Sequence, residues 1–270
     1  MARKVAAANA EAALDRAQEF IYDAWEANTA KRRVALAEKA LATSPLCADA
    51  YVLLAGHAEQ GSDRELDLWR RGVEAGETAL GKAAFDEYAG SFWGFLETRP
   101  YMRARLGLAQ ALWRRSVRDE AIDHLRDMLK LNPNDNQGVR YVVAAYLVEA
   151  ERDEDLAALL AEYPEDGMAA WAWTAALAAF RSTGDGEESR KLLAAALASN
   201  EHVLPYLLDE RRLPQQMPPY ISPGGEDEAI YYVSEFRAGW TLTPSAIDWL
   251  RAQAPASKAP KRRSRRSKPQ

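Results

Sequence analysis

Arginine, glutamine and tryptophan side chains recur over residues 101–114 at spacings that favour binding of carboxylate groups. Arg103, Gln110 and Arg114 are separated by seven and four residues, so a helix would present them on one face. A guanidinium group binds a carboxylate through two parallel hydrogen bonds. Trp113 lies beside them, and tryptophan is enriched among the residues that dominate binding energies. This segment therefore predicts a binding surface for an acidic or C-terminal carboxylate peptide.

The same arginines have a second interpretation. Helices rich in Glu and Asp offer many ion-pair partners, and arginines on such helices commonly pair with them at the surface. Residue types alone leave both interpretations open.

Side chains that support catalysis or metal binding do not converge in this sequence. The histidines, His57, His124 and His202, have no His or Cys three or four residues away, as a helical zinc site would require. We expect His124 to lie at the surface. Neither a glycine-rich phosphate loop nor a G-x-S-x-G motif occurs. We therefore expect a protein that is not an enzyme and that holds no cofactor and no metal.

The charge of the chain is divided between an acidic body and a basic tail. Residues 1–254 carry 28 basic and 40 acidic residues, whereas the last sixteen residues carry seven basic and no acidic ones. We expect residues 255–270 to be disordered. Such an arm attracts phosphate backbones but has no aromatic side chain for base stacking. It could equally remain solvated or fold onto the acidic body. The candidate nucleic-acid contacts include Lys261, Arg262, Arg263, Arg265, Arg266 and Lys268.

No run of 18 or more apolar residues occurs, and the first twenty residues contain no apolar core of signal-peptide length. The single Cys47 excludes a disulfide within the chain and fits a reducing compartment, where we expect it to pack as a small hydrophobic residue. We therefore expect a cytoplasmic protein that makes no use of a membrane.

The elements that would position these side chains follow a helical repeat. Residues 101–135 place small and apolar residues on two successive helices and end at Pro133, which is the pattern of a tetratricopeptide unit. A unit of this type cannot bury its apolar face alone, so neighbouring units must stack on it. The pattern positions are Leu108, Ala109 and Leu112 on the first helix, and Ala121, Leu125 and Met128 on the second.

An offset of 34 residues repeats this pattern. It places Val142, Val143 and Tyr146 on the next first helix, and a further step makes Asn200 equivalent to Asn132. We therefore predict an all-α protein of ten to twelve helices, arranged as a tetratricopeptide-like α-solenoid, a right-handed superhelix of helix pairs, with two C-terminal capping helices. The predicted domains are a repeat domain over 1–213, a proline-rich connector with capping helices over 214–254, and the tail over 255–270.

Two further segments carry specific expectations. Aromatic residues between Phe85 and Leu96 recur at three- and four-residue spacing, which predicts one buried helical stripe or, alternatively, an aromatic pocket with Trp93 exposed. Near the C-terminal end, Thr243 before Pro244 predicts the N-cap of the last helix.

In repeats of the tetratricopeptide class, the first helix of each unit lines the concave surface, and its outward side chains face the ligand. Carried over to this sequence, that property defines a candidate peptide-binding groove. Its members are Arg103, Gln110, Trp113, Arg114, Gln137, Arg140, Trp171 and Arg181.

Residues 30–250 resemble the bacterial relatives of the suppressor of tumorigenicity 7 proteins. The resemblance rests on SPLCADAYVLLA, the long block FWGFLETRPYMRARLGLA at residues 92–109, LRDMLKLNPNDNQGVRY and TPSAIDWL. It implies a tetratricopeptide-like, all-helical protein with no established enzymatic activity. Animal members of the family look membrane-associated through apolar segments that this sequence lacks, so the resemblance implies no membrane role.

Together these observations predict a non-catalytic helical-repeat scaffold or adaptor that binds a protein or peptide segment in its concave groove. The alternative is an adaptor associated with nucleic acid or the ribosome through the basic tail.

Overall fold

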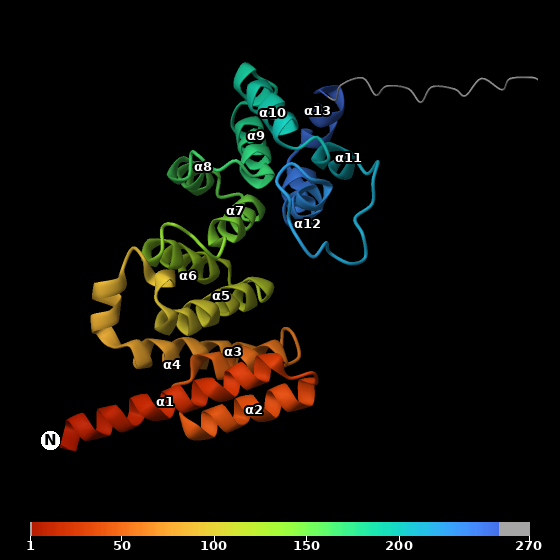
Figure 1. The fold of residues 1–270 in the computed structure, drawn as a ribbon. Coiled ribbons are helices and arrows are strands. Elements are labelled where there is room, and N and C mark those ends of the chain that lie inside the picture. Colours follow the sequence, from red (N-terminus) through yellow and green to blue (C-terminus); the bar gives the residue numbers. More distant parts are fainter. Residues whose placement is uncertain (1, 254–270) are drawn as a thin grey trace, which may run out of the picture. The chain divides into compact units, whose positions relative to one another are not determined.

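A computed structural model describes residues 2–253 of the chain. Side chains are described from residue 8 to residue 253. In that part of the chain it contains thirteen α-helices, two short 3-10 helices and no strand (Figure 1). The all-α prediction is confirmed, and consecutive helices pack in neighbouring pairs. The chain divides into two compact units, residues 1–150 and 151–270, which are described separately. The predicted tail, residues 255–270, lies outside the described residues.

The N-terminal unit is a succession of helix pairs in which each pair packs on the next. The pairs are α1 with α2, α3 with α4, and α5 with α6, and α7 follows on α6. The helices are α1 (Ala2–Glu26), α2 (Ala30–Thr43), α3 (Ala48–Gly56), α4 (Asp63–Tyr88), η1 (Phe92–Gly94), η2 (Leu96–Thr98), α5 (Arg99–Arg114), α6 (Arg118–Leu131) and α7 (Val139–Glu149).

The C-terminal unit joins three further helices of the repeat region to the helices beyond the proline-rich connector. Helix α9 packs on α8, α10 and α12, and α12 also contacts α11 and α13. Residues 209–225 form no helix, as their prolines predict. The helices are α8 (Asp153–Glu162), α9 (Ala169–Thr183), α10 (Glu187–Ser199), α11 (Val203–Leu207), α12 (Glu226–Leu242) and α13 (Ala246–Gln253).

The pattern positions of the central repeat are buried as predicted. All six side chains are buried, and Ala109 is fully buried. Asn132 and Asn200 are equivalent in structure as well as in sequence, because each is buried and forms the C-cap of its helix. The positions that the repeat pattern predicts to be apolar on α5 and α6 are therefore part of the core.

The offset of 34 residues predicts the buried positions of α7 one residue too early. The fully buried side chains there are Val143, Ala144 and Leu147, while Tyr146 is half-buried. The connection before α7 contains Gly138 in the left-handed conformation, with φ 71°, and this connection fixes where the helix begins. A step of constant length could not anticipate that turn.

The prediction of one continuous aromatic helix is wrong. Gly81 has φ 66° inside α4 and Gly90 has φ 88° after it, and these left-handed conformations interrupt a right-handed helix. The chain then forms the two 3-10 turns η1 and η2. Phe92 is fully buried against Phe85, whereas Phe95 is 36% exposed. The aromatic residues therefore divide between the core and the surface.

Helix α12 belongs to the core of the C-terminal unit. Its Trp240 lies edge-on to Trp173 of α9, with ring centroids 6.1 Å apart. The buried Glu228 carboxylate accepts hydrogen bonds from the backbone N–H of Ala169, at 2.8 Å, and from the Asn200 amide, at 2.9 Å. Glu228 thereby satisfies the first N–H of α9 and joins it to the end of α10.

The predicted N-cap at Thr243 is wrong. Helix α13 begins at Ala246, and the Thr243 hydroxyl instead donates to the carbonyl oxygen of Gly239 at 2.6 Å. Thr243 therefore ends α12, because Pro244 and Ser245, with φ 60°, form a turn before α13 begins.

Replacing Gly107 with alanine should destabilise the N-terminal unit by about 1–3 kcal/mol, because an added Cβ would lie 2.2 Å from the ring of Trp69 and would displace it. Urea unfolding measures the change. Gly56→Ala is the control, since nothing lies within 4 Å of its added methyl group. Equal stability of Gly107→Ala and the wild type would contradict the close packing of α4 on α5.

Candidate binding surface of the N-terminal unit

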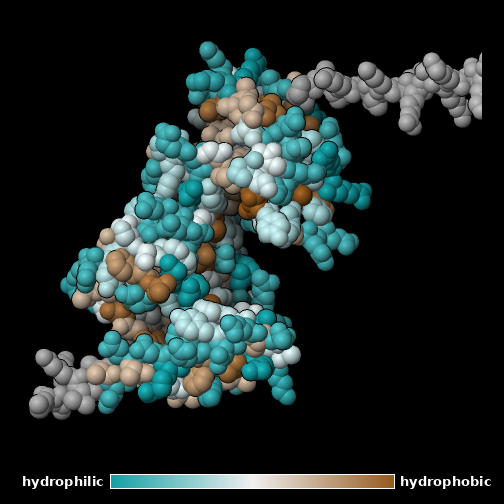
Figure 2. Space-filling view, viewed as in Figure 1, coloured by the Kyte–Doolittle hydropathy of each residue, from teal (hydrophilic) through white to brown (hydrophobic). Residues whose placement is uncertain are grey.

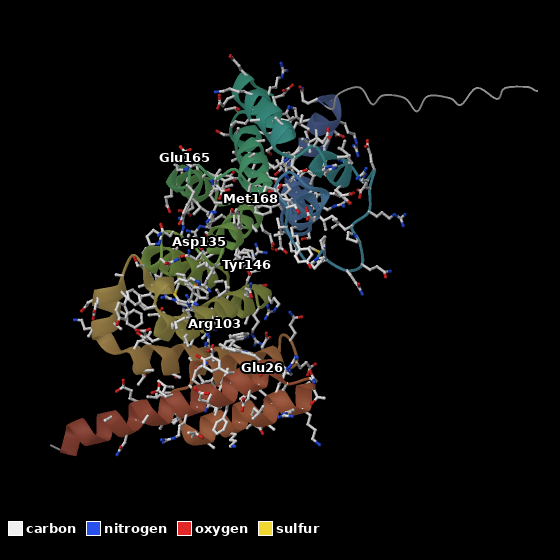
Figure 3. The ribbon with its side chains drawn as sticks, viewed as in Figure 1. Glu26, Arg103, Asp135, Tyr146, Glu165 and Met168 are labelled. Atoms are coloured by element: carbon white, nitrogen blue, oxygen red, sulfur yellow. The ribbon has the colours of Figure 1, made fainter. Side chains whose placement is uncertain are left out.

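Helix α5 carries Arg103, which is labelled in Figure 3. Arg103 lies at the wall of a cavity of about 290 Å³ in the N-terminal unit. Helices α1, α4 and α5, the turn η2 and the start of α3 surround it. Most of its wall is apolar, and its acidic members are Asp15 and Glu97. The other lining residues are Leu14, Gln18, Tyr22, Leu46, Ala48, Gly76, Ala79, Leu96 and Pro100.

The guanidinium group of Arg103 is occupied by an internal carboxylate. Its Nε and Nη2 donate to the two oxygens of Asp49 at 2.8 and 2.6 Å, and the Gln18 amide donates to the same carboxylate at 3.0 Å. Asp49 is completely buried, while the Arg103 side chain is 31% exposed. Two hydrogen-bonded oxygens and an opposite charge offset the cost of burying Asp49. Arg103 also lies 5.4 Å from the ring centre of Trp25.

Arg114 has the same role at the other end of α5. It forms an ion pair with the buried Glu65 near the start of α4, and Glu65 also accepts from the backbone N–H of Gly61 at 2.6 Å. Its neighbour Arg115 pairs with the exposed Asp63 at 2.6 Å. The end of α5 is thus bound to the turn that begins α4.

Trp113 of α5 and Tyr146 of α7, the latter labelled in Figure 3, form an aromatic stack. Their rings are parallel to within 5°, with centroids 3.9 Å apart, and Arg118 lies 5.1 Å from the centre of the Trp113 ring. Both aromatic residues are half-buried, as is Gln110 on α5. These side chains keep part of their surface accessible.

The connection before α7 holds the next two predicted groove residues. Asp135 accepts from the backbone N–H groups of Val139 and Arg140, at 2.7 and 2.9 Å, and from the Arg140 side chain at 3.1 Å. Burial raises the pKa of the Asp135 carboxyl, and these donors oppose the rise. Gln137 is half-buried, and its amide oxygen accepts no hydrogen bond from the residues that the structure describes.

The two predicted groove residues of the C-terminal unit are mostly inaccessible. Trp171 is buried and lies edge-on to Tyr163. The Arg181 side chain is 7% exposed, pairs with Asp153 at 3.0 Å and donates to the Thr243 hydroxyl at 2.8 Å. It lines a cavity of about 400 Å³ within this unit.

All four arginines of the predicted groove therefore have acidic partners within the protein. The second interpretation of the sequence anticipates ion pairs but places them at the surface, whereas the Asp49, Glu65 and Asp135 carboxylates are buried. The sequence did not reveal the accessible aromatic residues of α1, since Tyr22 is 50% and Trp25 46% exposed. Their positions among five acidic residues in the segment 11–26 could have indicated them. Hydrophilic residues cover most of the unit in the view of Figure 2, with hydrophobic residues between them.

His124 lies at the α5–α6 contact rather than at the surface. Its Nδ1 accepts from the Arg105 Nε at 3.2 Å, and Arg105 also pairs with Asp127 at 2.8 Å. Burial and then the positive charge of Arg105 lower the pKa of His124, against the opposing carboxylates of Glu120, Asp127 and Asp123. The neutral ring is therefore part of the packed state.

Among residues 2–253, no three His, Cys, Asp or Glu side chains gather in a way that could hold a metal ion. Cys47 is buried, and burial raises the pKa of its thiol to about 11. Over the same residues, no helix has the length and apolar character needed to span a membrane.

Over the described residues, these features define an all-helical protein built from neighbouring helix pairs, in which arginines pair with the buried carboxylates of Asp49, Glu65 and Asp135. The chain belongs to the Tcf25 family, whose model, described as transcriptional repressor TCF25, matches residues 106–268.

Relatives over a longer stretch carry the name suppressor of tumorigenicity 7. The chain is 26% identical to Protein ST7 homolog of Caenorhabditis elegans, with 86% of this chain and 49% of the relative covered. It is 27% identical to Suppressor of tumorigenicity 7 protein of Macaca fascicularis, over 76% of this chain and 42% of the relative. The chain thus spans less than half the length of these relatives. No solved structure matches it. The expected family resemblance is confirmed, and the bacterial source remains a prediction.

Replacing Arg103 with leucine should cost about 3–5 kcal/mol of unfolding free energy, because it leaves the Asp49 carboxylate buried without its counter-charge. Arg115→Leu should cost less than about 1 kcal/mol, since its partner Asp63 is exposed. Urea unfolding compares the two variants. Equal costs would show that Arg103 does not neutralise a buried charge.

The unfolding free energy should fall as the pH is lowered through the region just below 6.5. His124 has its ordinary pKa in the unfolded chain and a lower one in the folded protein, so the unfolded chain takes up the proton first. This stability is present above 6.5 and is lost towards the lower, folded pKa. The variant His124→Gln should flatten the pH dependence measured by urea unfolding between neutral and mildly acidic pH. An unchanged slope would contradict the assignment.

Proposed function

We propose that this protein is a non-catalytic helical scaffold that binds a segment of a partner protein, and that it acts as a regulator rather than as an enzyme. The observation that carries the proposal is the set of half-exposed and exposed aromatic side chains on its N-terminal unit. Trp25, Trp113 and Tyr146 each lie beside an arginine or another ring and retain accessible surface. Aromatic residues of this kind are enriched at protein interfaces.

The superhelical arrangement and the concave groove remain part of this proposal. Gln110, Trp113 and the accessible parts of Arg103, Arg114, Gln137 and Arg140 are its candidate contacts in the N-terminal unit. Trp171 and Arg181 are mostly covered. We therefore propose them as contacts only for a conformation in which the C-terminal unit has opened. The description of the family as a transcriptional repressor supports a regulatory role, and the lone Cys47 supports the cytoplasm as the compartment.

A second candidate function is contact with nucleic acid through the basic tail. Two observations favour it: the family is named for transcriptional repression, and its model extends to residue 268, across the seven basic residues. It ranks second because residues 151–253 carry 18 acidic and 8 basic residues. These nearby carboxylates compete with phosphate groups for the tail.

Affinity capture from native lysate tests both functions, with mass spectrometry as the measurement. The baits are the full chain, residues 1–254, and a full chain carrying Gln110→Glu and Trp113→Ala, each with and without nuclease. The scaffold predicts a partner that is kept by the first two baits, is indifferent to nuclease and is depleted by the third. Glu38→Gln, at an exposed position of α2, is the matched control.

Partners that disappear with the tail or with nuclease would favour the second function. Charge reversal of Arg103 or Arg114 would be a poor test, because either change would unpair a buried carboxylate and unfold part of the unit.

A further inference from the structure

One face of α1 combines acidic and aromatic side chains. Between residues 8 and 26 this helix carries five acidic residues and one basic residue, Arg16. All five acidic residues are exposed, and so are Tyr22 and Trp25, whose ring centroids lie 5.7 Å apart. Exposed aromatic rings among carboxylates offer apolar contact together with negative charge. The acidic residues are Glu11, Asp15, Glu19, Asp23 and Glu26.

The cavity described above opens beside this face. Tyr22 and Leu14 of α1 form part of its wall, and Leu96 of η2, 69% exposed, forms another part. Its volume of about 290 Å³ accommodates one large apolar side chain. Leu96 owes its exposure to the 3-10 turn, which holds it outside the core that Phe92 fills.

The charge at the cavity is negative, although an arginine lines it. The Nε and Nη2 groups of Arg103 both donate to Asp49, and the pair is neutral as a unit. The remaining charged groups of the wall are the carboxylates of Asp15 and Glu97. An acidic peptide would therefore meet like charges, whereas a cationic one would meet complementary charges.

We infer that this surface binds a basic amphipathic segment of a partner protein, with one apolar side chain in the cavity and Lys or Arg side chains against α1 and Glu97. The inference rests on the proposed scaffold function and names the class of its partner. The charge of this partner is opposite to that of the acidic peptide which the arginines of α5 predict in the sequence. The protein's own tail supplies the cations but has no Leu, Ile, Val, Phe or Met to fill the cavity.

Fluorescence anisotropy of labelled peptides with the full chain tests this inference. The probe is a short peptide in which leucines are flanked by lysines. Three comparison peptides are a glutamate version, a version with alanine in place of leucine, and residues 255–270 of the protein itself. We expect the leucine–lysine peptide to bind most tightly, and more weakly as salt is raised.

Variants at exposed positions locate the site without disturbing the core. Asp15→Lys with Glu97→Lys should weaken binding of the leucine–lysine peptide about tenfold. Leu96→Ser should weaken it by removing apolar contact. The matched control, Glu38→Lys with Asp86→Lys, makes the same change of charge at exposed residues outside the cavity and should leave the affinity unchanged.

Tighter binding of the glutamate peptide, equal effects of the two charge pairs, or no binding of any peptide would each overturn the inference. The scaffold function would survive those results if lysate capture still returned a nuclease-indifferent partner that depends on Gln110 and Trp113. If lysate capture returned no such partner while the leucine–lysine peptide bound as expected, the groove on α5 and α7 would be contradicted and the α1 surface would be supported.

Discussion

The N-terminal unit depends on the neutralisation of carboxylates that its own helices bury. Asp49 of α3 and Glu65 of α4 lie in the interior, where an unpaired negative charge would cost several kcal/mol. Helix α5 supplies both counter-charges, Arg103 near its start and Arg114 at its end. The position of α5 against the two preceding helices is therefore fixed by charge as well as by apolar contact. These ion pairs occupy hydrogen-bond donors of both arginines that would otherwise be open to a ligand.

The C-terminal unit uses a buried carboxylate differently. Glu228 has backbone and amide hydrogen-bond donors in place of an arginine, because it meets the first N–H of α9 and the side chain of Asn200. A carboxylate at a helix N-terminus is favoured by the helix dipole. The helices after the proline-rich connector are consequently bound to the last repeat-like pair, α9 with α10, by a specific polar contact as well as by the Trp173–Trp240 packing.

The sequence predicts those parts of the fold that depend on local spacing. Ala109 and Leu125 lie in the core because small and bulky residues alternate at helical periodicity. Three features lie beyond that reasoning. Positive φ angles at Gly81 and Gly90 interrupt the helix that the spacing of the aromatic residues predicts. The pairing of Arg103 with Asp49 joins residues 54 apart in the sequence, which no helical spacing encodes. Exposure of Tyr22 and Trp25 depends on which face of α1 meets α2, and acidic neighbours alone only suggest it.

Because Cys47 is buried, its reactivity measures how often the helices around it separate. It is the only thiol in the sequence, it lies in the core shared by α1, α2 and α3, and burial raises the pKa of its thiol to about 11. A thiol-reactive dye reaches such a group only when the surrounding helices separate, so its labelling rate reports the opening equilibrium of this region. Cys47 packs against the buried face of α1. A segment that binds the exposed face of α1 and holds this helix in place would therefore slow the labelling of a cysteine that it does not touch.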